Sequence, residues 1–180
     1  KTWSNGGVPV EGAASGTIAM GVDAEYLVWS TDSKGVWFAQ YSPHSWTASK
    51  GIAQGAIVRS DRVNKSKFYG FKDGSFYVST DGGATFTASA VADLPKKGNF
   101  QTVFGVEGEL WLAGDTVLWH SSDSGSSFQK VRGVDSASVV GFGKAAPNQT
   151  YPAVYFNGQV AGVQGIYRSD DQAVSFTRIN

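Results

Sequence analysis

Short apolar and aromatic runs recur along the whole chain, each bounded by Gly, Ser, Asp, Asn or Lys. Runs of β-branched and aromatic residues between turn formers are typical of strands. Four such runs follow one another at residues 54–59, 67–71, 75–79 and 86–89. Later stretches repeat the pattern at residues 110–112, 117–119, 153–156 and 165–168. Since no helical spacing of apolar residues interrupts them, the sequence predicts an all-β fold.

An eight-residue motif closes these stretches, with Ser at its first position, Asp at its third, Gly at its fifth and an aromatic residue at its eighth. Residues 79–86 and 121–128 match strictly, while residues 169–176 carry Ala173 in place of Gly. A degenerate copy of the motif covers residues 39–46, and Trp3 with Ser4 resembles the end of a further copy. The motif residues are Ser79, Asp81, Gly83, Phe86, Ser121, Asp123, Gly125, Phe128, Ser169, Asp171 and Phe176.

The closing aromatic residues give the period of the repeat. Trp46, Phe86, Phe128 and Phe176 follow one another at intervals of 40 to 48 residues. A period near forty with four strands in each repeat is the signature of β-propeller blades. We therefore expect one propeller segment of about four blades, with repeats at roughly 4–46, 47–86, 87–128 and 129–180.

The residue types of the motif indicate a structural role. A Ser hydroxyl and an Asp carboxylate can cap the amides of a tight turn between the third and fourth strands. Gly at the fifth position supplies a positive φ, and the aromatic residue can pack back between neighbouring sheets. Asp81, Asp123 and Asp171 are accordingly expected to serve their own turns and not catalysis.

Composition excludes several function classes. Fifteen Lys and Arg balance fifteen Asp and Glu, so no overall field draws the chain to nucleic acid or to anionic membranes. No apolar run approaches the length of a membrane span, about 20 residues. The chain has no cysteine, and its two histidines, His44 and His120, lie far apart in the sequence. We expect no metal site and no cofactor.

Three longer runs carry a resemblance to a known family. They are residues 60–71 with 74–83, residues 110–114 with 118–123, and residues 141–147 with 165–171. These runs resemble the C-terminal propeller of glycoside hydrolase family 74, and the likeness extends over nearly the whole chain. The resemblance implies a seven-bladed Asp-box ring that faces a second propeller across a cleft for xyloglucan or a related β-glucan. It also implies endo-β-1,4-glucanase-type hydrolysis with inversion, by an acid and a base carboxylate.

No catalytic residue carries over from the family. Its second propeller places an aspartate in a Gly-Asp-x-x-Gly-Phe context, and no such run occurs here. The chain is thus expected to begin after the catalytic blade, to stop before ring closure, and to be inactive alone. It would supply scaffold and cleft wall to a secreted xyloglucanase, with the remaining propeller portion or a second copy as partner. The alternative is a non-catalytic Asp-box propeller that binds a glycan or a protein.

Sugar contacts are expected in the loops on the propeller face opposite the Asp-box turns. Those segments are residues 5–15, 31–35, 49–54, 72–75, 95–99 and 157–164. An exposed aromatic ring can stack on a pyranose while polar side chains bond its hydroxyls. The candidate substrate-binding residues are Asp32, Lys34, Trp37, Asn157 and Gln159.

Each of these interpretations has a structural alternative. Trp37 can instead be a core residue of a third strand, as is expected of Trp29, Trp111 and Trp119. Asp61 and Arg62 can form a turn and an ion pair without any functional role. Two Asn-x-Ser/Thr triplets, at Asn64 and Asn148, fall on the far side and are compatible with secretion.

Overall fold

The computed structural model describes residues 12–180, apart from residues 14, 42–44 and 115. The described chain forms four four-stranded sheets, and no helix occurs in it. The strands are β1 (Thr17–Met20), β2 (Tyr26–Ser30), β3 (Val36–Gln40), β4 (Trp46–Ala48), β5 (Ile57–Ser60), β6 (Phe68–Lys72), β7 (Ser75–Ser79), β8 (Thr87–Ala88), β9 (Asn99–Thr102), β10 (Leu110–Gly114), β11 (Val117–Ser121), β12 (Gln129–Lys130), β13 (Val134–Gly143), β14 (Ala153–Val160), β15 (Val163–Ser169) and β16 (Thr177–Arg178).

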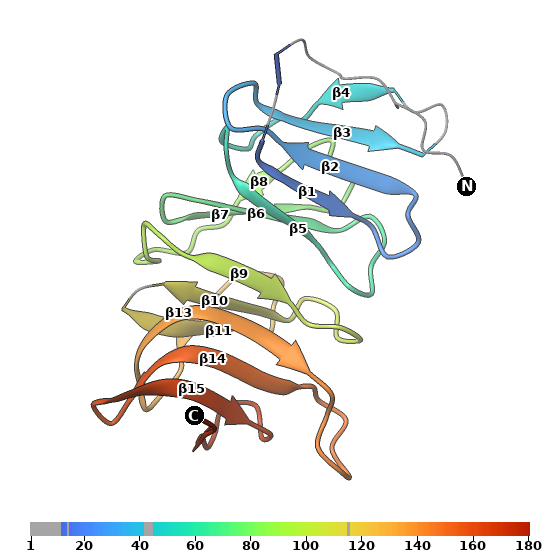
Figure 1. The fold of residues 1–180 in the computed structure, drawn as a ribbon. Coiled ribbons are helices and arrows are strands. Elements are labelled where there is room, and N and C mark those ends of the chain that lie inside the picture. Colours follow the sequence, from blue (N-terminus) through green and yellow to red (C-terminus); the bar gives the residue numbers. More distant parts are fainter. Residues whose placement is uncertain (1–11, 14, 42–44, 115) are drawn as a thin grey trace. The chain divides into compact units, whose positions relative to one another are not determined.

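Each sheet is a meander in which strands pair in chain order (Figure 1). We call β1–β4 sheet A, β5–β8 sheet B, β9–β12 sheet C and β13–β16 sheet D. The paired strands run antiparallel, as in the register of Val28 with Phe38 or Leu112 with Trp119. The all-β prediction and the count of four strands per repeat are therefore confirmed, and the fourth strand of each sheet is the shortest.

The chain divides into two compact units. Unit 1 comprises Lys1–Lys72 and Phe76–Ser89, and unit 2 comprises Asp73–Ser75 and Ala90–Asn180. Sheets A and B belong to unit 1, except for the first residue of β7, and sheets C and D belong to unit 2.

The core of unit 1 lies between the facing sides of sheets A and B. Val28 of β2 and Val58 of β5 are fully buried there, together with Phe68 of β6. Phe86 closes the first strict motif and is only 3% exposed in the same cluster. The Thr17 hydroxyl accepts a 3.0 Å hydrogen bond from the Val58 amide, which links the inner strands of the two sheets. Burial of each large apolar side chain contributes about 2 kcal/mol, so this layer holds the unit together.

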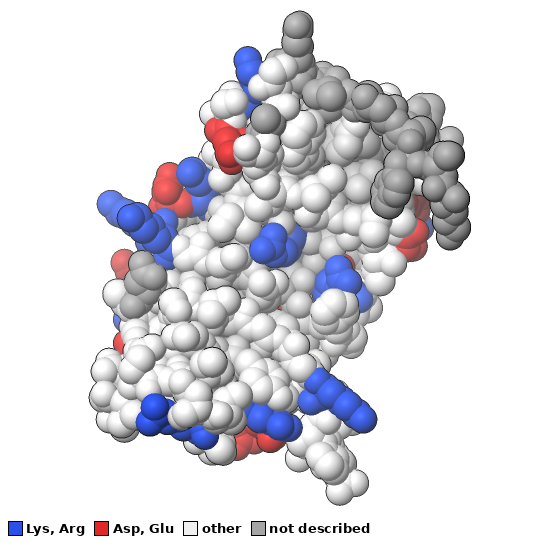
Figure 2. All heavy atoms as spheres, viewed as in Figure 1, with Lys and Arg blue, Asp and Glu red and all other residues white. Residues whose placement is uncertain are grey.

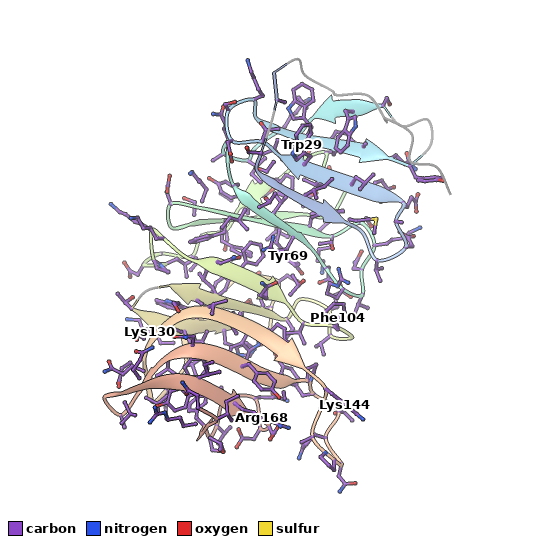
Figure 3. All side chains as sticks on the ribbon, viewed as in Figure 1. Trp29, Tyr69, Phe104, Lys130, Lys144 and Arg168 are labelled. Atoms are coloured by element: carbon purple, nitrogen blue, oxygen red, sulfur yellow. The ribbon has the colours of Figure 1, made fainter. Side chains whose placement is uncertain are left out.

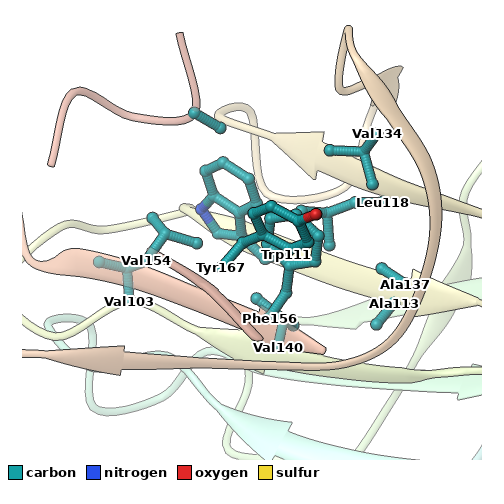
Figure 4. Close-up of a cluster of buried hydrophobic side chains, with 11 residues drawn as sticks. Val103, Trp111, Ala113, Leu118, Val134, Ala137, Val140, Val154, Phe156 and Tyr167 are labelled. Atoms are coloured by element: carbon teal, nitrogen blue, oxygen red, sulfur yellow. The ribbon is translucent and has the colours of Figure 1, made fainter. Parts of the chain in front are cut away.

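The core of unit 2 packs the aromatic rings of Trp111, Phe156 and Tyr167 among aliphatic side chains (Figure 4). Trp111 of β10 is fully buried, in agreement with the sequence prediction. Phe156 stacks on Tyr167 with ring centroids 5.4 Å apart, and Phe176 meets Phe156 edge-on at 87°. Offset and edge-on pairs are the favoured aromatic geometries. The closing aromatic residue of the third motif thus packs within its own sheet as well as against the core cluster.

The three Ser-x-Asp turns share one hydrogen-bond pattern. In each, the Ser hydroxyl donates to the Asp carboxylate and accepts the backbone N–H four residues beyond the Ser. The Ser79, Ser121 and Ser169 donations are 2.7, 2.8 and 2.7 Å long. The same carboxylates accept the N–H of Thr85, Ser127 and Ser175, each at 2.9 Å. Each turn is therefore capped by its own two side chains.

These bonds also set the ionisation of the turn carboxylates. Hydrogen bonds from the Ser175 side chain and backbone lower the pKa of Asp171 to about 2. Burial raises the pKa of Asp123, but the bonds from Ser127 and Ser121 outweigh it and hold that pKa below its ordinary value. A carboxylate that accepts several hydrogen bonds in its charged form is a poor proton donor near neutral pH. This geometry suits a structural cap and not an acid catalyst.

Candidate functional site

The β2–β3 hairpin of sheet A brings three of the five candidate sugar-binding residues together. Its turn is held by Thr31, whose hydroxyl accepts the Lys34 N–H at 2.8 Å and donates to the Gly35 carbonyl at 2.8 Å. The Trp37 indole N–H then donates to the Lys34 carbonyl at 2.8 Å. Asp32 and Lys34 are exposed and Trp37 is half-buried, so the hairpin tip presents a carboxylate, an ammonium and part of an indole ring to solvent.

A second predicted segment of the same face adjoins this tip. The Gln54 amide, in the loop between β4 and β5, donates a 3.2 Å hydrogen bond to the Asp32 carbonyl. The Lys72 ammonium lies nearby, because a Cβ on Gly55 would sit 3.8 Å both from it and from the Asp32 carbonyl oxygen. Loops 31–35 and 49–54 are therefore neighbours in the fold, as the propeller reasoning requires. The cluster Asp32, Lys34, Trp37 and Gln54 is the candidate site of unit 1.

Trp37 belongs to a group of three tryptophans in sheet A. It is the cross-strand partner of Trp29, which is labelled in Figure 3, and the Trp29 ring meets Trp46 edge-on with centroids 6.1 Å apart. The prediction that Trp29 is a core residue is wrong, because this ring is half-exposed and its indole N–H donates to the Ser15 carbonyl at 3.2 Å. The reason lies in strand alternation: Val28 takes the face that packs against sheet B, so Trp29 points the other way. Trp119, in contrast, is buried as predicted.

The other two candidate residues lie on sheet D of unit 2. The segment 157–164 was expected to be a loop, but it consists of the ends of β14 and β15 around a turn at Ala161 and Gly162. The Asn157 side-chain oxygen Oδ1 accepts a 3.0 Å bond from the Gln164 side-chain amide, and the Gln159 side-chain amide donates to the Gly162 carbonyl at 2.9 Å. Asn157 is exposed and Gln159 is half-buried. Both amides thus already take part in the hairpin.

Most of the remaining predicted segments are short turns. Residues 72–75 contain the two-residue β6–β7 turn at Asp73 and Gly74, and residues 95–99 lead into β9. Most of segment 5–15, the Trp3 motif tail and His44 lie outside the described residues. Asn148 is exposed in the β13–β14 loop, whereas Asn64 is half-buried and its side-chain oxygen accepts the Ser66 N–H at 3.2 Å.

Asp61 is a buried turn residue. Its carboxylate accepts the N–H groups of Val63 and Asn64 at 2.8 and 2.9 Å, and the Tyr69 hydroxyl donates to it at 2.7 Å. The side chain is 1% exposed, so substrate has no access to it in this arrangement. The sequence interpretation of Asp61 as a turn former matches these contacts.

One polar group that sequence reasoning passed over lies in unit 2. Glu109 is 6% exposed, and one of its carboxylate oxygens is 2.6 Å from His120 Nε2 and 2.8 Å from the donating Tyr151 hydroxyl. The Trp111 indole N–H donates in turn to the Tyr151 oxygen at 2.8 Å. Burial raises the pKa of the Tyr151 phenol well above its ordinary value, which keeps the donor protonated. Only the pairing of Trp111 with His120 in adjacent strands could have signalled this network from sequence.

Charged side chains do not gather into one large patch on the visible face of the described residues (Figure 2). On the face shown in Figure 2, charged side chains are scattered over a largely uncharged surface, and basic and acidic groups lie next to one another in places. Within the described residues, no cluster of three metal-binding side chains occurs. The described part of the chain also contains no helix long and apolar enough to cross a membrane.

Comparison with curated proteins and solved structures identifies relatives of this chain. No family model matches the chain. A curated xyloglucanase from a Paenibacillus species is 49% identical over 96% of the chain, and xyloglucanase Xgh74A of Acetivibrio thermocellus is 44% identical over 92%. The crystal structure of the Niastella koreensis family 74 enzyme superposes with a TM-score of 0.83 at 36% identity over 92% of the chain. The chain is a segment of a glycoside hydrolase family 74 protein.

The chain covers only part of the length of each of these relatives. It spans 18% of the Paenibacillus protein and 20% of the Acetivibrio protein. A family 74 xyloglucanase structure from Xanthomonas campestris gives the same result, with a TM-score of 0.80 at 31% identity and coverage of 24% of that chain. The resemblance predicted from the three long runs is thus confirmed in both sequence and fold.

Proposed function

We propose that this chain forms scaffold and cleft wall of a secreted, inverting xyloglucan hydrolase of the endo-β-1,4-glucanase type. The observation that carries the proposal is the agreement of nearly the whole chain with family 74 xyloglucanases, at 49% sequence identity with one of them. The cluster Asp32, Lys34, Trp37 and Gln54 supports it, because a partly exposed aromatic ring flanked by polar groups suits contact with a glucan backbone. Asn157 and Gln159 are proposed as further sugar contacts on the sheet D hairpin.

The acid and base are proposed to lie in the rest of the parent enzyme. Inversion requires two carboxyl groups roughly 6.5–9.5 Å apart, with one of them protonated. The carboxylates Asp81, Asp123 and Asp171 cap their own turns, and Asp61 and Glu109 are buried with hydrogen-bond partners. Asp23 and Glu25 are both engaged by the Lys65 ammonium. These groups are structural, so the isolated chain is expected to be inactive.

A complementation assay tests the proposal. The 180-residue chain is incubated with xyloglucan, alone and together with a fragment that supplies the remainder of a family 74 enzyme, and new reducing ends are measured. We expect no turnover by either part alone and recovery of activity in the mixture. Turnover by the lone chain would contradict the assignment of its carboxylates. A mixture that stays inactive, although light scattering shows a complex, would favour the non-catalytic glycan- or protein-binding propeller.

A further inference from the structure

Sheet A has one face that no other sheet of unit 1 covers within the described residues. Val28 points toward sheet B, and the neighbouring Trp29 points the other way. We call the Trp29 side the outer face of sheet A. Its cross-strand rows carry no charged residue, and its large side chains are Ile18, Met20, Leu27, Trp29, Trp37 and Trp46. Ile18 and Met20 are 63% and 53% exposed, so this is a broad apolar surface of the kind that marks an interaction site.

Sheet B shows the same positions in a covered state. Alignment of the two sheets by their motifs and cross-strand registers places Ile18 at the position of Val58 and Trp46 at the position of Phe86. Val58 is fully buried and Phe86 is 3% exposed, because both pack against sheet A. Sheet A therefore lacks the neighbour that it provides for sheet B.

Sheet D exposes the matching side. The same alignment places Val139 of β13 at the position of Thr17 of β1. Within unit 1 that side is covered, and the Thr17 hydroxyl accepts the Val58 N–H there at 3.0 Å. Val139, in contrast, is 51% exposed, and Ile166 and Ile179 on the same side are 39% and 50% exposed. We call this side the outer face of sheet D, since its other side packs into the core of unit 2.

The outer face of sheet D can receive an apolar partner without stranding its cation. The Arg168 guanidinium lies 5.7 Å from the Tyr155 ring centroid and pairs with the Asp170 carboxylate at 2.9 Å. A Cβ built on Gly141 of the same face would meet nothing within 4 Å. That open space suits a bulky ring such as Trp29, because large side chains pack best where the opposing surface is bare.

We propose that the outer face of sheet D of one copy of this chain packs on the outer face of sheet A of a second copy, head to tail. The contact repeats the packing of sheet A on sheet B. By the same alignment, Val139 of one copy lies against Ile18 of the other, as Thr17 lies against Val58 within unit 1. A second copy is the partner because each chain carries both halves of the contact. The inference does not rest on the proposed function.

The size of the two faces indicates a weak contact. Four strands about 4.8 Å apart, with about five residues of about 3.3 Å each, cover roughly 300 Å². That footprint is small for a specific interface, so association is expected to depend on concentration. Because the two faces differ, the contact is heterologous and each chain can engage two neighbours at once.

Sedimentation equilibrium of the 180-residue chain tests the proposal, at concentrations from about 10 µM to about 1 mM, where so small a contact dissociates. We expect a mean mass that exceeds that of one chain, 19.1 kDa, and rises with concentration. Ile18→Lys and Val139→Lys each place an unpaired ammonium in the contact and should weaken association by at least roughly tenfold. Val174→Lys is the control, because this valine is 84% exposed in the third motif turn and lies on neither outer face; it should associate like the parent chain.

Both substituted positions are exposed in the single chain, so the variants should fold normally. Circular dichroism at the lowest concentration checks this, with melting curves like that of the parent chain as the expected result. Loss of association is then attributable to the contact itself.

An equimolar mixture of the two variants gives the sharpest outcome. The Ile18→Lys chain keeps an intact sheet D face and the Val139→Lys chain keeps an intact sheet A face, so the mixture should form a complex of two chains and stop there. A parent chain that stays at the mass of one chain throughout would overturn the second copy as the partner. Association of Val139→Lys alone, which would mean that two sheet A faces pair with each other, or a mixture without a complex would overturn the head-to-tail arrangement.

Discussion

Gly83 offers the sharpest test of how the repeats pack. It lies at the fifth position of the first strict motif, at φ +91°, and is buried against sheet A. An added Cβ would come 2.2 Å from a Val28 methyl group and 3.4 Å from the Phe38 Cβ. Val28 is fully buried, so it cannot move aside without disturbing the core of unit 1. Gly83→Ala is therefore expected to destabilise unit 1 through both the backbone and the packing.

The two contributions can be estimated separately. A non-glycine residue at positive φ costs about 1 kcal/mol of unfolding free energy, and overpacking a buried site costs about 1–3 kcal/mol more. The expected loss for Gly83→Ala is thus about 2–4 kcal/mol. Gly35→Ala is the matched control in the same unit, since Gly35 has φ +84° but only the Trp37 Nε1 atom, at 4.0 Å, near its added Cβ. It should lose only the backbone contribution, about 1 kcal/mol.

Urea unfolding followed by tryptophan fluorescence measures both variants at 25 °C. The slope against urea concentration must be the same in all variants for the free energies to be comparable. We expect the midpoint of Gly83→Ala to fall well below that of Gly35→Ala. Equal losses in the two variants would refute the claim that the motif turn packs on the preceding sheet without room for a methyl group.

Four further predictions concern the turns, the buried network and the sugar contacts. Ser121→Ala removes a hydroxyl that accepts the buried Gly125 N–H at 2.9 Å and should lower the unfolding free energy by about 1–3 kcal/mol in urea titrations. The control Ser122→Ala changes an exposed neighbour and should lower it by less than about 0.5 kcal/mol. The pKa of Asp171 is about 2, against an ordinary value of 3.8, so its stabilising effect is present above pH 4 and is lost as the pH falls toward 2. Melting curves should therefore show that Asp171→Asn is less stable than the parent chain at pH 7 and indistinguishable from it below pH 2. Tyr151→Phe leaves the buried Trp111 N–H without its acceptor and should destabilise unit 2 by about 2 kcal/mol in the same urea assay; no change would mean that the network adds nothing to the stability of unit 2. Trp37→Ala should raise the KM of the complemented enzyme for xyloglucan by roughly three- to tenfold with kcat unchanged, while Tyr41→Ala, at an exposed ring just past the other end of β3, should leave KM unaltered.

The strands were predictable because each depends on local composition. Residues 75–79, in which Phe76, Tyr77 and Val78 stand between two serines, form β7 with those bounds. The face that a side chain takes was less predictable. Trp29 and Val28 are adjacent and both apolar, and only the position of sheet B decides which of them is buried. Strand alternation says that the two differ but not which of them points inward.

The candidate site shows the same division between local and long-range information. The Thr31–Gly35 turn could be predicted, since Ser, Asp, Lys and Gly cluster there between two apolar runs. The bond from Gln54 to Asp32 joins residues 22 positions apart and follows only from the packing of sheets A and B. Asn157 and Gln159 were expected in a loop on the sugar-binding face, but cross-strand pairing with Ile166 and Gln164 extends the sheet through them.

The third motif indicates which of the motif's residues define the turn. Ala173 replaces glycine, yet its N–H donates to the Ser169 hydroxyl at 2.7 Å, as the Gly83 and Gly125 amides donate to their serines. The hydroxyl and the carboxylate therefore suffice to form the turn, and glycine is required only where the preceding sheet leaves no room for a Cβ. It follows that Ala173→Gly should change the unfolding free energy by less than about 1 kcal/mol, because relief of the positive φ offsets the loss of one buried methyl group. A large loss in that variant would mean that the methyl group of Ala173, and not the cap, holds the third turn in place.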